Sequence, residues 1–340
     1  MCRTRWIFVF IFQIFLLLVG CGEKDAKSVV NDLSKRSEKM ESYMSHGKLT
    51  IQTGQEPQVI DIEVWYKKPH YYRVALKNTK NNITQILLRN DEGVYVLTPS
   101  IKKSFRFQSD WPESSGQIYL YQSILSSIID DQKRQFQKGD KEYLFEVASK
   151  HTLNQNWKKQ KVWLDQDLNP KKVSVLNAKD EVMVEMVFDR FKLDASFDQD
   201  AFDMQRNLNH LTEESKQTIA GLDMKKEQDL ASVVPAYIPM GSRLDGEKTV
   251  QTIHGPAVIV RYAGAQPFTI VQKKAQEMET YLSESVKPVM LYQGFGILFS
   301  QENQKQLKWL DGKREFELTG NLPEEEMVKI ANSFAGQPDK

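Results

Sequence analysis

The strands that this sequence predicts follow one another too closely to pair in any way but antiparallel. Apolar residues alternate with polar ones along Ile60, Ile62, Val64 and Tyr66, and a period of two residues marks a half-buried strand. A short turn at 67–70 leads directly into the next predicted strand at 71–77. A parallel connection needs a dozen or more residues, so these neighbours must be antiparallel.

The same pattern continues over the first two thirds of the chain. Further strands are predicted at about 82–89, 94–98, 102–108, 134–138, 142–148, 159–164, 171–177 and 181–193. Apolar residues at helical spacing predict helices at about 26–44 and 117–129. We therefore expect one α+β unit over 26–205, a single curved antiparallel sheet of about eleven strands with helices against one face; the resemblance described below makes this sheet an unclosed half-barrel with a helical lid. A sandwich of two sheets is the alternative.

The remaining third predicts a second, smaller unit. The polar stretch 206–233 is expected to be a connector, and 234–336 a small α+β domain. Its strands are predicted near 235–238, 249–253, 257–263, 268–273, 288–293, 296–300, 306–310 and 314–319. A closing helix should begin at Pro323, because proline and the acidic residues after it favour a helix start.

The first 20 residues have the pattern of a secretory signal peptide. Arg3 and Arg5 precede an apolar run that ends in Leu18-Val19-Gly20-Cys21. This ending resembles a bacterial lipobox, so we expect cleavage before Cys21, a lipid on Cys21 and a short linker over 21–25. The alternative is a transmembrane anchor, but a run of about 14 residues is shorter than a spanning helix needs. The predicted location is the outer face of the cytoplasmic membrane, with the lipidated Cys21 as the membrane contact.

Charge and motif content favour a protein without catalysis. The net charge of +1 gives no indication of a nucleic-acid partner. The five histidines show no metal-ligand spacing, and no nucleophile elbow or phosphate loop is present. Neither a cofactor nor a metal is expected, and we predict that the chain is not an enzyme. An undetected hydrolase is the alternative, and a polar cleft with a base next to a nucleophile would support it.

The candidate site is apolar. Aromatic residues flank the turn after Tyr66, and the 117–129 helix is almost wholly hydrophobic. These side chains either fill the core or line a cavity that the helices only partly cover. In the second case a lipid, an acyl chain or a lipoprotein would contact these residues: Trp65, Tyr66, Tyr71, Ile118, Leu120, Leu125 and Ile128.

Three segments resemble the LolA-like lipoprotein carriers. They are Trp65 to Arg73, which contains Lys67-Lys68-Pro69, then Val162 to Val173, and finally Val187 to Phe191 followed by Phe202. The resemblance covers about residues 26–205 and implies an eleven-stranded unclosed barrel with helices over an apolar cavity. Lys68 stands where the carriers have an arginine that helps to hold the lid, and lysine lacks its planar fork of donors. A tethered chain would also not shuttle between membranes.

The C-terminal part, from Tyr237 to Ile330-Ala331, looks like a small domain of unknown function that recurs in proteins of spore-forming bacilli. The whole architecture resembles the sporulation lipoprotein family of that group. This resemblance implies a role in envelope or sporulation physiology and no defined reaction, while the LolA-like half-barrel implies that the protein binds an apolar ligand. The alternative is a protein–protein regulator, either of the anti-sigma type or a spore-germination partner, in which the half-barrel is a scaffold. An open apolar cavity would favour the ligand binder, and a filled core with an exposed apolar patch would favour the regulator.

Overall fold

The computed structural model describes residues 25–53, 56–80, 82–107, 111, 117–149, 157–209, 232–276, 279–281, 286–312 and 314–335. The predicted signal peptide and Cys21 lie outside these residues. Within the described part, no helix combines the length and the apolar character that crossing a membrane requires.

The first eleven strands form one sheet. Their bounds are β1 Ser42–Ile51, β2 Gln58–Lys67, β3 Tyr71–Asn78, β4 Thr84–Asn90, β5 Gly93–Thr98, β6 Lys103–Phe107, β7 Gln135–Lys138, β8 Glu142–Ala148, β9 Lys159–Asp165, β10 Pro170–Leu176 and β11 Val182–Leu193. A twelfth strand, β15 (Glu279–Tyr281), joins the edge next to β6.

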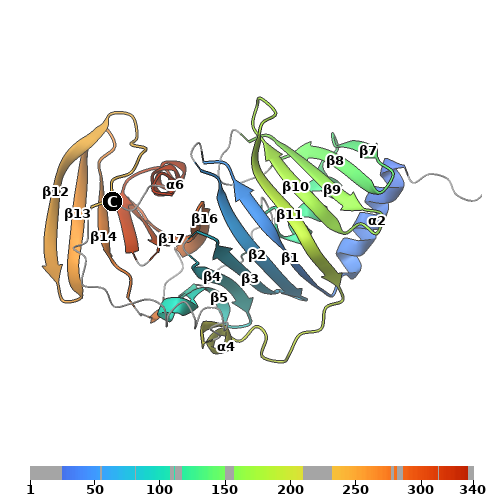
Figure 1. Ribbon diagram of the computed structural model, residues 1–340, viewed down its shortest axis with the longest axis horizontal. Coiled ribbons are helices and arrows are strands. Elements are labelled where there is room, and N and C mark those ends of the chain that lie inside the picture. Colours follow the sequence, from blue (N-terminus) through green and yellow to red (C-terminus); the bar gives the residue numbers. More distant parts are fainter. Residues whose placement is uncertain are drawn as a thin grey trace, which may run out of the picture.

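The order of this large sheet is β15-β6-β5-β4-β3-β2-β1-β11-β10-β9-β8-β7. Strand β1 pairs with both β2 and β11, and so joins the two runs of consecutive strands. Neighbours pair antiparallel except β15, which lies parallel to β6. The sheet curves without closing, since β7 and β15 are its two ends (Figure 1). The predicted unclosed antiparallel sheet of about eleven strands is confirmed.

Helices α2 (Ala26–Lys39) and α3 (Tyr121–Asp130) lie together over part of the inner face of this sheet. The Asp25 carboxylate caps α2 by accepting a hydrogen bond from the Ser28 amide at 2.8 Å, which satisfies one free N–H of the first turn. The predicted end of this helix at residue 44 is wrong, because Met44 lies in β1. Pairing of β1 on both edges outweighs the helical spacing of Met40 and Met44.

The second sheet has seven strands in the order β12-β13-β14-β19-β18-β17-β16. Their bounds are β12 Ser242–Thr252, β13 Gly255–Gly264, β14 Phe268–Lys274, β16 Val286–Leu291, β17 Gly294–Gln301, β18 Gln304–Asp311 and β19 Arg314–Gly320. Helix α6 (Glu324–Asn332) packs on one face through Met327, Ile330 and Ala331. The strand predicted near 235–238 is not formed, and β12 starts at Ser242 instead.

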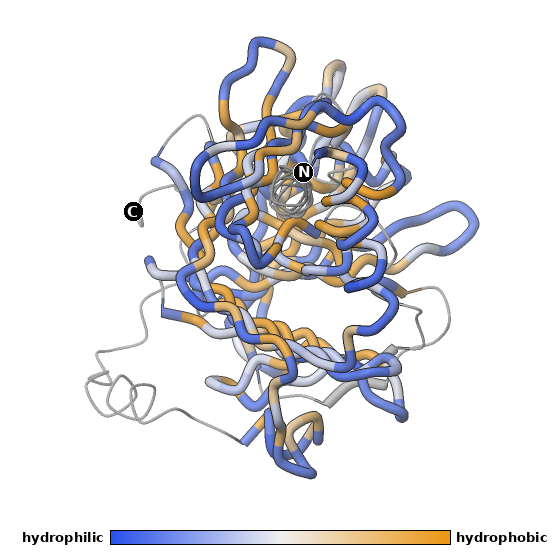
Figure 2. The backbone as a smooth tube through the Cα atoms, turned by 90° about the vertical axis from the view of Figure 1, so that its right-hand side faces the viewer, coloured by the Kyte–Doolittle hydropathy of each residue, from blue (hydrophilic) through white to orange (hydrophobic). Residues whose placement is uncertain are grey.

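The second sheet supplies a third cover for the inner face of the large sheet. Val286, Phe295 and Ile297 of β16 and β17 belong to the same buried cluster as α3 and the inner-face strands. Strand β17 lies against β3, at the end of the large sheet that faces the second domain (Figure 1). Hydrophobic stretches lie toward the inside and hydrophilic loops at the periphery (Figure 2). Two helices alone do not cover the large sheet.

A short segment covers part of the outer face. It contains α4 (Met204–Asn209), and its Ala201, Phe202 and Leu208 pack against Ile86, Leu88, Tyr95 and Leu97 of β4 and β5. The Arg73 guanidinium donates from Nε to Asn207 Oδ1 at 2.7 Å, and so ties α4 to β3.

Candidate functional site

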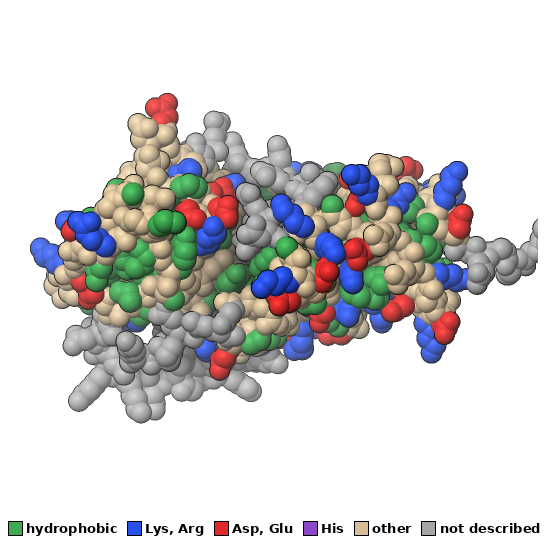
Figure 3. Space-filling view, turned by 90° about the horizontal axis from the view of Figure 1, so that it is seen from above, with side chains coloured by type: hydrophobic (Ala, Val, Ile, Leu, Met, Phe, Trp, Pro, Cys, Tyr) green, Lys and Arg blue, Asp and Glu red, His purple; other side chains and the backbone are tan. Residues whose placement is uncertain are grey.

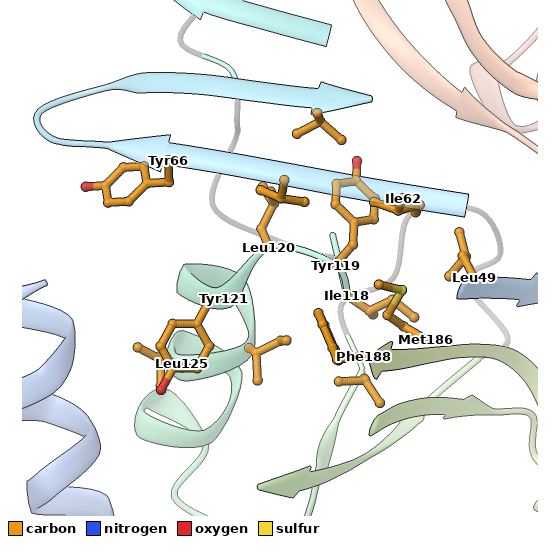
Figure 4. Packing of buried hydrophobic residues seen from close by; sticks show 14 of the residues in the cluster. Leu49, Ile62, Tyr66, Ile118, Tyr119, Leu120, Tyr121, Leu125, Met186 and Phe188 are labelled. Atoms are coloured by element: carbon orange, nitrogen blue, oxygen red, sulfur yellow. The ribbon is translucent and has the colours of Figure 1, made fainter. Parts of the chain in front are cut away.

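Four of the predicted ligand-contacting residues lie together beneath the inner face of the large sheet. Leu120, Leu125 and Ile128 have no exposed surface, and Ile118 keeps only 2%. They share one cluster with Leu49, Ile62, Tyr66, Met186 and Phe188 (Figure 4). The side chains around α3 therefore pack against one another as a core does.

The three predicted aromatic residues lie on opposite faces of the sheet. Tyr66 points inward to the cluster, whereas Trp65 and Tyr71 pack on the outer face against Phe197 and Phe202. Consecutive residues of a strand point to opposite faces, and Tyr71 pairs with Lys67, the neighbour of Tyr66. The seven predicted residues do not converge on one site.

A row of tyrosines crosses the inner face instead. Tyr43 is the register partner of Tyr66, and Tyr66 that of Tyr72, so the three rings lie side by side on β1, β2 and β3. Their centroids are 5.5 Å and 4.9 Å apart. A tyrosine with the ordinary pKa of 10.0 is already neutral at physiological pH, and burial raises the pKa of each of these three further. All three are therefore neutral hydrogen-bonding groups.

Polar atoms lie beside this row at the start of α3. The Tyr43 hydroxyl donates to Gln122 Oε1 at 2.9 Å and accepts from the Tyr121 amide at 3.1 Å. Ser45 Oγ is buried and has no hydrogen-bond partner among the described residues. Tyr43, Ser45 and Gln122 were not predicted as site residues. Only the register that brings Tyr43 to Tyr66 reveals them, and the sequence does not show that register.

Lys68 holds the end of helix α2. Its ammonium donates to the Glu38 carbonyl at 3.0 Å and to Glu41 Oε1 at 2.9 Å. Free carbonyls at a helix C-terminus favour a nearby cation. The lysine thus contacts the helix that covers the inner face.

The junction between the two sheets carries buried polar contacts. The Gln85 side chain accepts from the Phe295 amide at 2.7 Å and donates to the Phe295 carbonyl at 3.3 Å. Lys103 Nζ lies 2.8 Å from Glu315 Oε2, with side chains only 1% and 7% exposed. A Cβ on Gly294 would lie 2.2 Å from Gln85 Oε1, so any larger residue there would force the Gln85 side chain to move.

Large hydrophobic side chains are exposed just before and at the start of β12. Five of the eight such residues in the described part fall within 234–244, and Met240 is 91% exposed. We call this stretch the exposed apolar segment. Its five residues are Val234, Tyr237, Ile238, Met240 and Leu244. Figure 3 shows hydrophobic side chains gathered on the second domain, whereas charged side chains are spread over the large sheet.

The described part of the chain brings no metal-binding cluster together. No three histidine, cysteine or acidic side chains gather there as a metal site would require. His46 contacts Asp189 and His70 contacts Asp91, both as exposed pairs. His151 and His210 lie outside the described residues.

The fold and these contacts define a two-domain β protein whose half-barrel is covered by helices and by its own second domain. A family model described as "Sporulation protein YdcC-like" matches residues 3–202, and a domain of unknown function (DUF4367) matches 232–334. The sporulation protein YdcC of Bacillus subtilis (strain 168) is 36% identical over 333 residues, which are 96% of this chain and 95% of that protein. The chain belongs to the family of YdcC-like sporulation proteins, as its resemblance predicted.

Solved structures with a similar fold include MucB, at 14% identity and a TM-score of 0.34 over 92% of this chain and 98% of MucB. The LolA superfamily protein NE2245 from Nitrosomonas europaea matches 54% of this chain and 99% of its own, at 13% identity and a TM-score of 0.29. A structure of the CwlD amidase from Clostridioides difficile in complex with the GerS lipoprotein matches 53% of this chain and 99% of the matched chain, at 16% identity and a TM-score of 0.21.

Proposed function

We propose that this chain is a non-catalytic accessory protein of sporulation that acts outside the cytoplasm by binding a protein partner. In this proposal Cys21 carries the lipid that holds the protein at the outer face of the cytoplasmic membrane, and the half-barrel is a packed scaffold. The observation that carries the proposal is the exposed apolar segment, because large exposed hydrophobic side chains that gather in one place mark interaction sites. Membership of the sporulation family supports the physiological setting.

The burial of the α3 side chains favours a scaffold over a lipid carrier. Leu120, Leu125 and Ile128 have no exposed surface, and the β16–β17 hairpin takes up a further part of the inner face. A resident acyl chain would have to displace these contacts.

Site-specific photo-cross-linking in sporulating cells tests the proposal. A cross-linking residue at Met240 or Leu244 should capture the same protein. Ile253 provides a matched control, since it is 95% exposed but lies beyond the other end of β12. At about 3.3 Å per residue it is roughly 30 Å from Leu244. Equal capture from Ile253, or no capture from Met240 and Leu244, would contradict the proposal.

Apolar-ligand binding remains the second candidate because of one observation. Ser45 Oγ is buried without a hydrogen-bond partner in the described residues, on the same strand as Tyr43 of the tyrosine row. A lipid carbonyl or head group could accept its hydrogen bond. Mass spectrometry of lipids extracted from protein purified from its own membranes distinguishes the two candidates. A stoichiometric lipid would favour the ligand binder.

A further inference from the structure

The Gln85 side chain contacts a polypeptide backbone in the way a neighbouring strand does. Its amide accepts from the N–H and donates to the C=O of one residue, Phe295, at 2.7 Å and 3.3 Å. Gln85 is itself buried at 5% exposure. This two-point contact fits the backbone N–H and C=O of one residue in an extended chain and does not fit an acyl chain, which offers no N–H donor.

The ion pair at the same junction is buried between the domains. Burial lowers the pKa of Lys103, while Glu315 opposes that shift. Removing two charges from water costs free energy that their attraction only partly offsets. Both charges would return to water if the domains separated, so this pair makes separation less costly than a wholly apolar interface would. Interfaces between domains of one chain commonly allow such motion.

The surface beneath the hairpin is apolar around these two anchors. Phe105, Leu76 and Leu87 of the large sheet share one cluster with Phe295 and Ile297 of β17. When the second domain moves away, the large sheet presents an apolar surface that contains one amide group, of Gln85, and one ammonium group, of Lys103. This combination suits an extended peptide with an apolar side chain and a nearby carboxylate.

We propose that the inner face of β3–β6, with Gln85 and Lys103 as anchors, is a binding site for a polypeptide segment. The chain's own second domain occupies this site in the closed state, with Phe295 of β17 at Gln85 and Glu315 of β19 at Lys103. The inference rests on the proposed function in one respect, that the bound segment (the guest) belongs to a protein. It adds a second surface that contacts the partner and states which chemical groups of the guest bind there. Gln85 holds the backbone of the guest, and Lys103 binds its carboxylate.

Hydrogen exchange of the full chain tests the opening. Glu315→Gln leaves Lys103 buried without its charged partner, so amides of β16, β17 and β4–β6 should exchange roughly tenfold faster, while those of β9–β11 stay unchanged. Glu317→Gln is the matched control, since Glu317 is two residues further along β19 and pairs with Lys308 of the adjacent strand in the same sheet. The proposal would be overturned if the amides of β16, β17 and β4–β6 exchanged at the same rate as those of β9–β11 in both the wild type and Glu315→Gln. Such equal rates would mean that the junction opens only when the whole chain unfolds.

A fluorescent peptide with the sequence of residues 294–301, which contains no acidic side chain, tests the part of the site that Gln85 anchors. It should bind Glu315→Gln at least about ten times more tightly than the wild type, and adding Gln85→Leu should remove the gain. Binding that does not depend on Gln85 would overturn the proposal, as would no binding by a variant whose junction has opened.

The double substitution Lys103→Met with Glu315→Leu covers the case in which Glu315→Gln fails to fold. An apolar pair should hold the junction closed, with slower exchange and weaker peptide binding than the wild type. Unchanged or faster exchange would count against the proposal. Cross-linking at Met240 reports on the proposed function separately, so either idea can fail without the other.

Discussion

At the scale of single residues, the central question is whether the apolar side chains around α3 are core or cavity wall. Leu125 is the sharpest probe, because it has no exposed surface and lies in the cluster that joins α3 to the sheet.

Leu125→Ala should lower the free energy of unfolding by about 2–5 kcal/mol, the cost of an emptied core position. Urea denaturation followed by tryptophan fluorescence measures the change. Val187→Ala is the control, because Val187 is 43% exposed and should cost little. A loss well below this range for Leu125→Ala, together with altered lipid binding, would instead indicate an open cavity.

The buried tyrosines make stability depend on alkaline pH. Burial raises the pKa of Tyr121 from 10.0 to about 12, so the folded state keeps this proton at pH values where the unfolded chain loses it. The stability that this group contributes is therefore complete below pH 10 and is lost as the pH rises toward 12. Tyr121→Phe should make the decline between pH 10 and 12 shallower, and urea denaturation at several pH values measures it. If the free energy of unfolding fell equally steeply with pH in the wild type and in Tyr121→Phe, Tyr121 would not be the group responsible for the decline.

At the scale of elements, helix α2 depends on a contact outside itself. Lys68 reaches the Glu38 carbonyl near the end of the helix from the turn between β2 and β3. The contact joins the helix to the sheet that it covers.

Lys68→Ala should speed hydrogen exchange in the last turn of α2, with a change in unfolding free energy of only about 0–1 kcal/mol because the pair is partly exposed. Lys48→Ala is the matched control, since the Lys48–Asp61 pair lies within the sheet and touches no helix. Equal exchange of α2 in both variants would show that Lys68 does not hold the helix.

The elements that the sequence predicts are those with a long, regular pattern. Alternation predicted most strands of the large sheet, whereas β15 has only three residues and was missed. The predicted strand near 235–238 is absent, and Tyr237 instead donates a hydrogen bond to Glu326 of α6. The site was predicted least well. Trp65 and Tyr71 carry the right chemistry but face outward, and neither the tyrosine row nor the Gln85–Phe295 contact leaves a local pattern in the sequence.

At the scale of the whole molecule, the second domain is part of the cover of the first. The apolar face that two helices leave open is closed by β16 and β17, so the two domains share one buried cluster. Attachment to a membrane, if Cys21 is lipidated as proposed, then holds both domains together at one surface.

Cys21→Ala should release the protein from the membrane fraction, because two acyl chains bind a bilayer firmly at about 0.8 kcal/mol per buried methylene. Cell fractionation with immunoblotting measures the distribution, and intact-mass spectrometry shows whether the lipid is present. Cys2→Ala is the control, since Cys2 lies in the predicted signal peptide. A wild-type chain without lipid and with an uncut leader would contradict the proposal.

The parallel pairing of β15 with β6 also determines when the large sheet can be completed. Register partners such as Ser104 and Glu279 are about 175 residues apart in the chain. A chain synthesised from its N-terminus therefore presents β6 as a bare edge until β15 has emerged, and bare edges recruit strands from other molecules. Fragments that end before residue 279 expose this edge together with the inner face that β16 and β17 cover, so they should aggregate even though they contain every strand of the half-barrel.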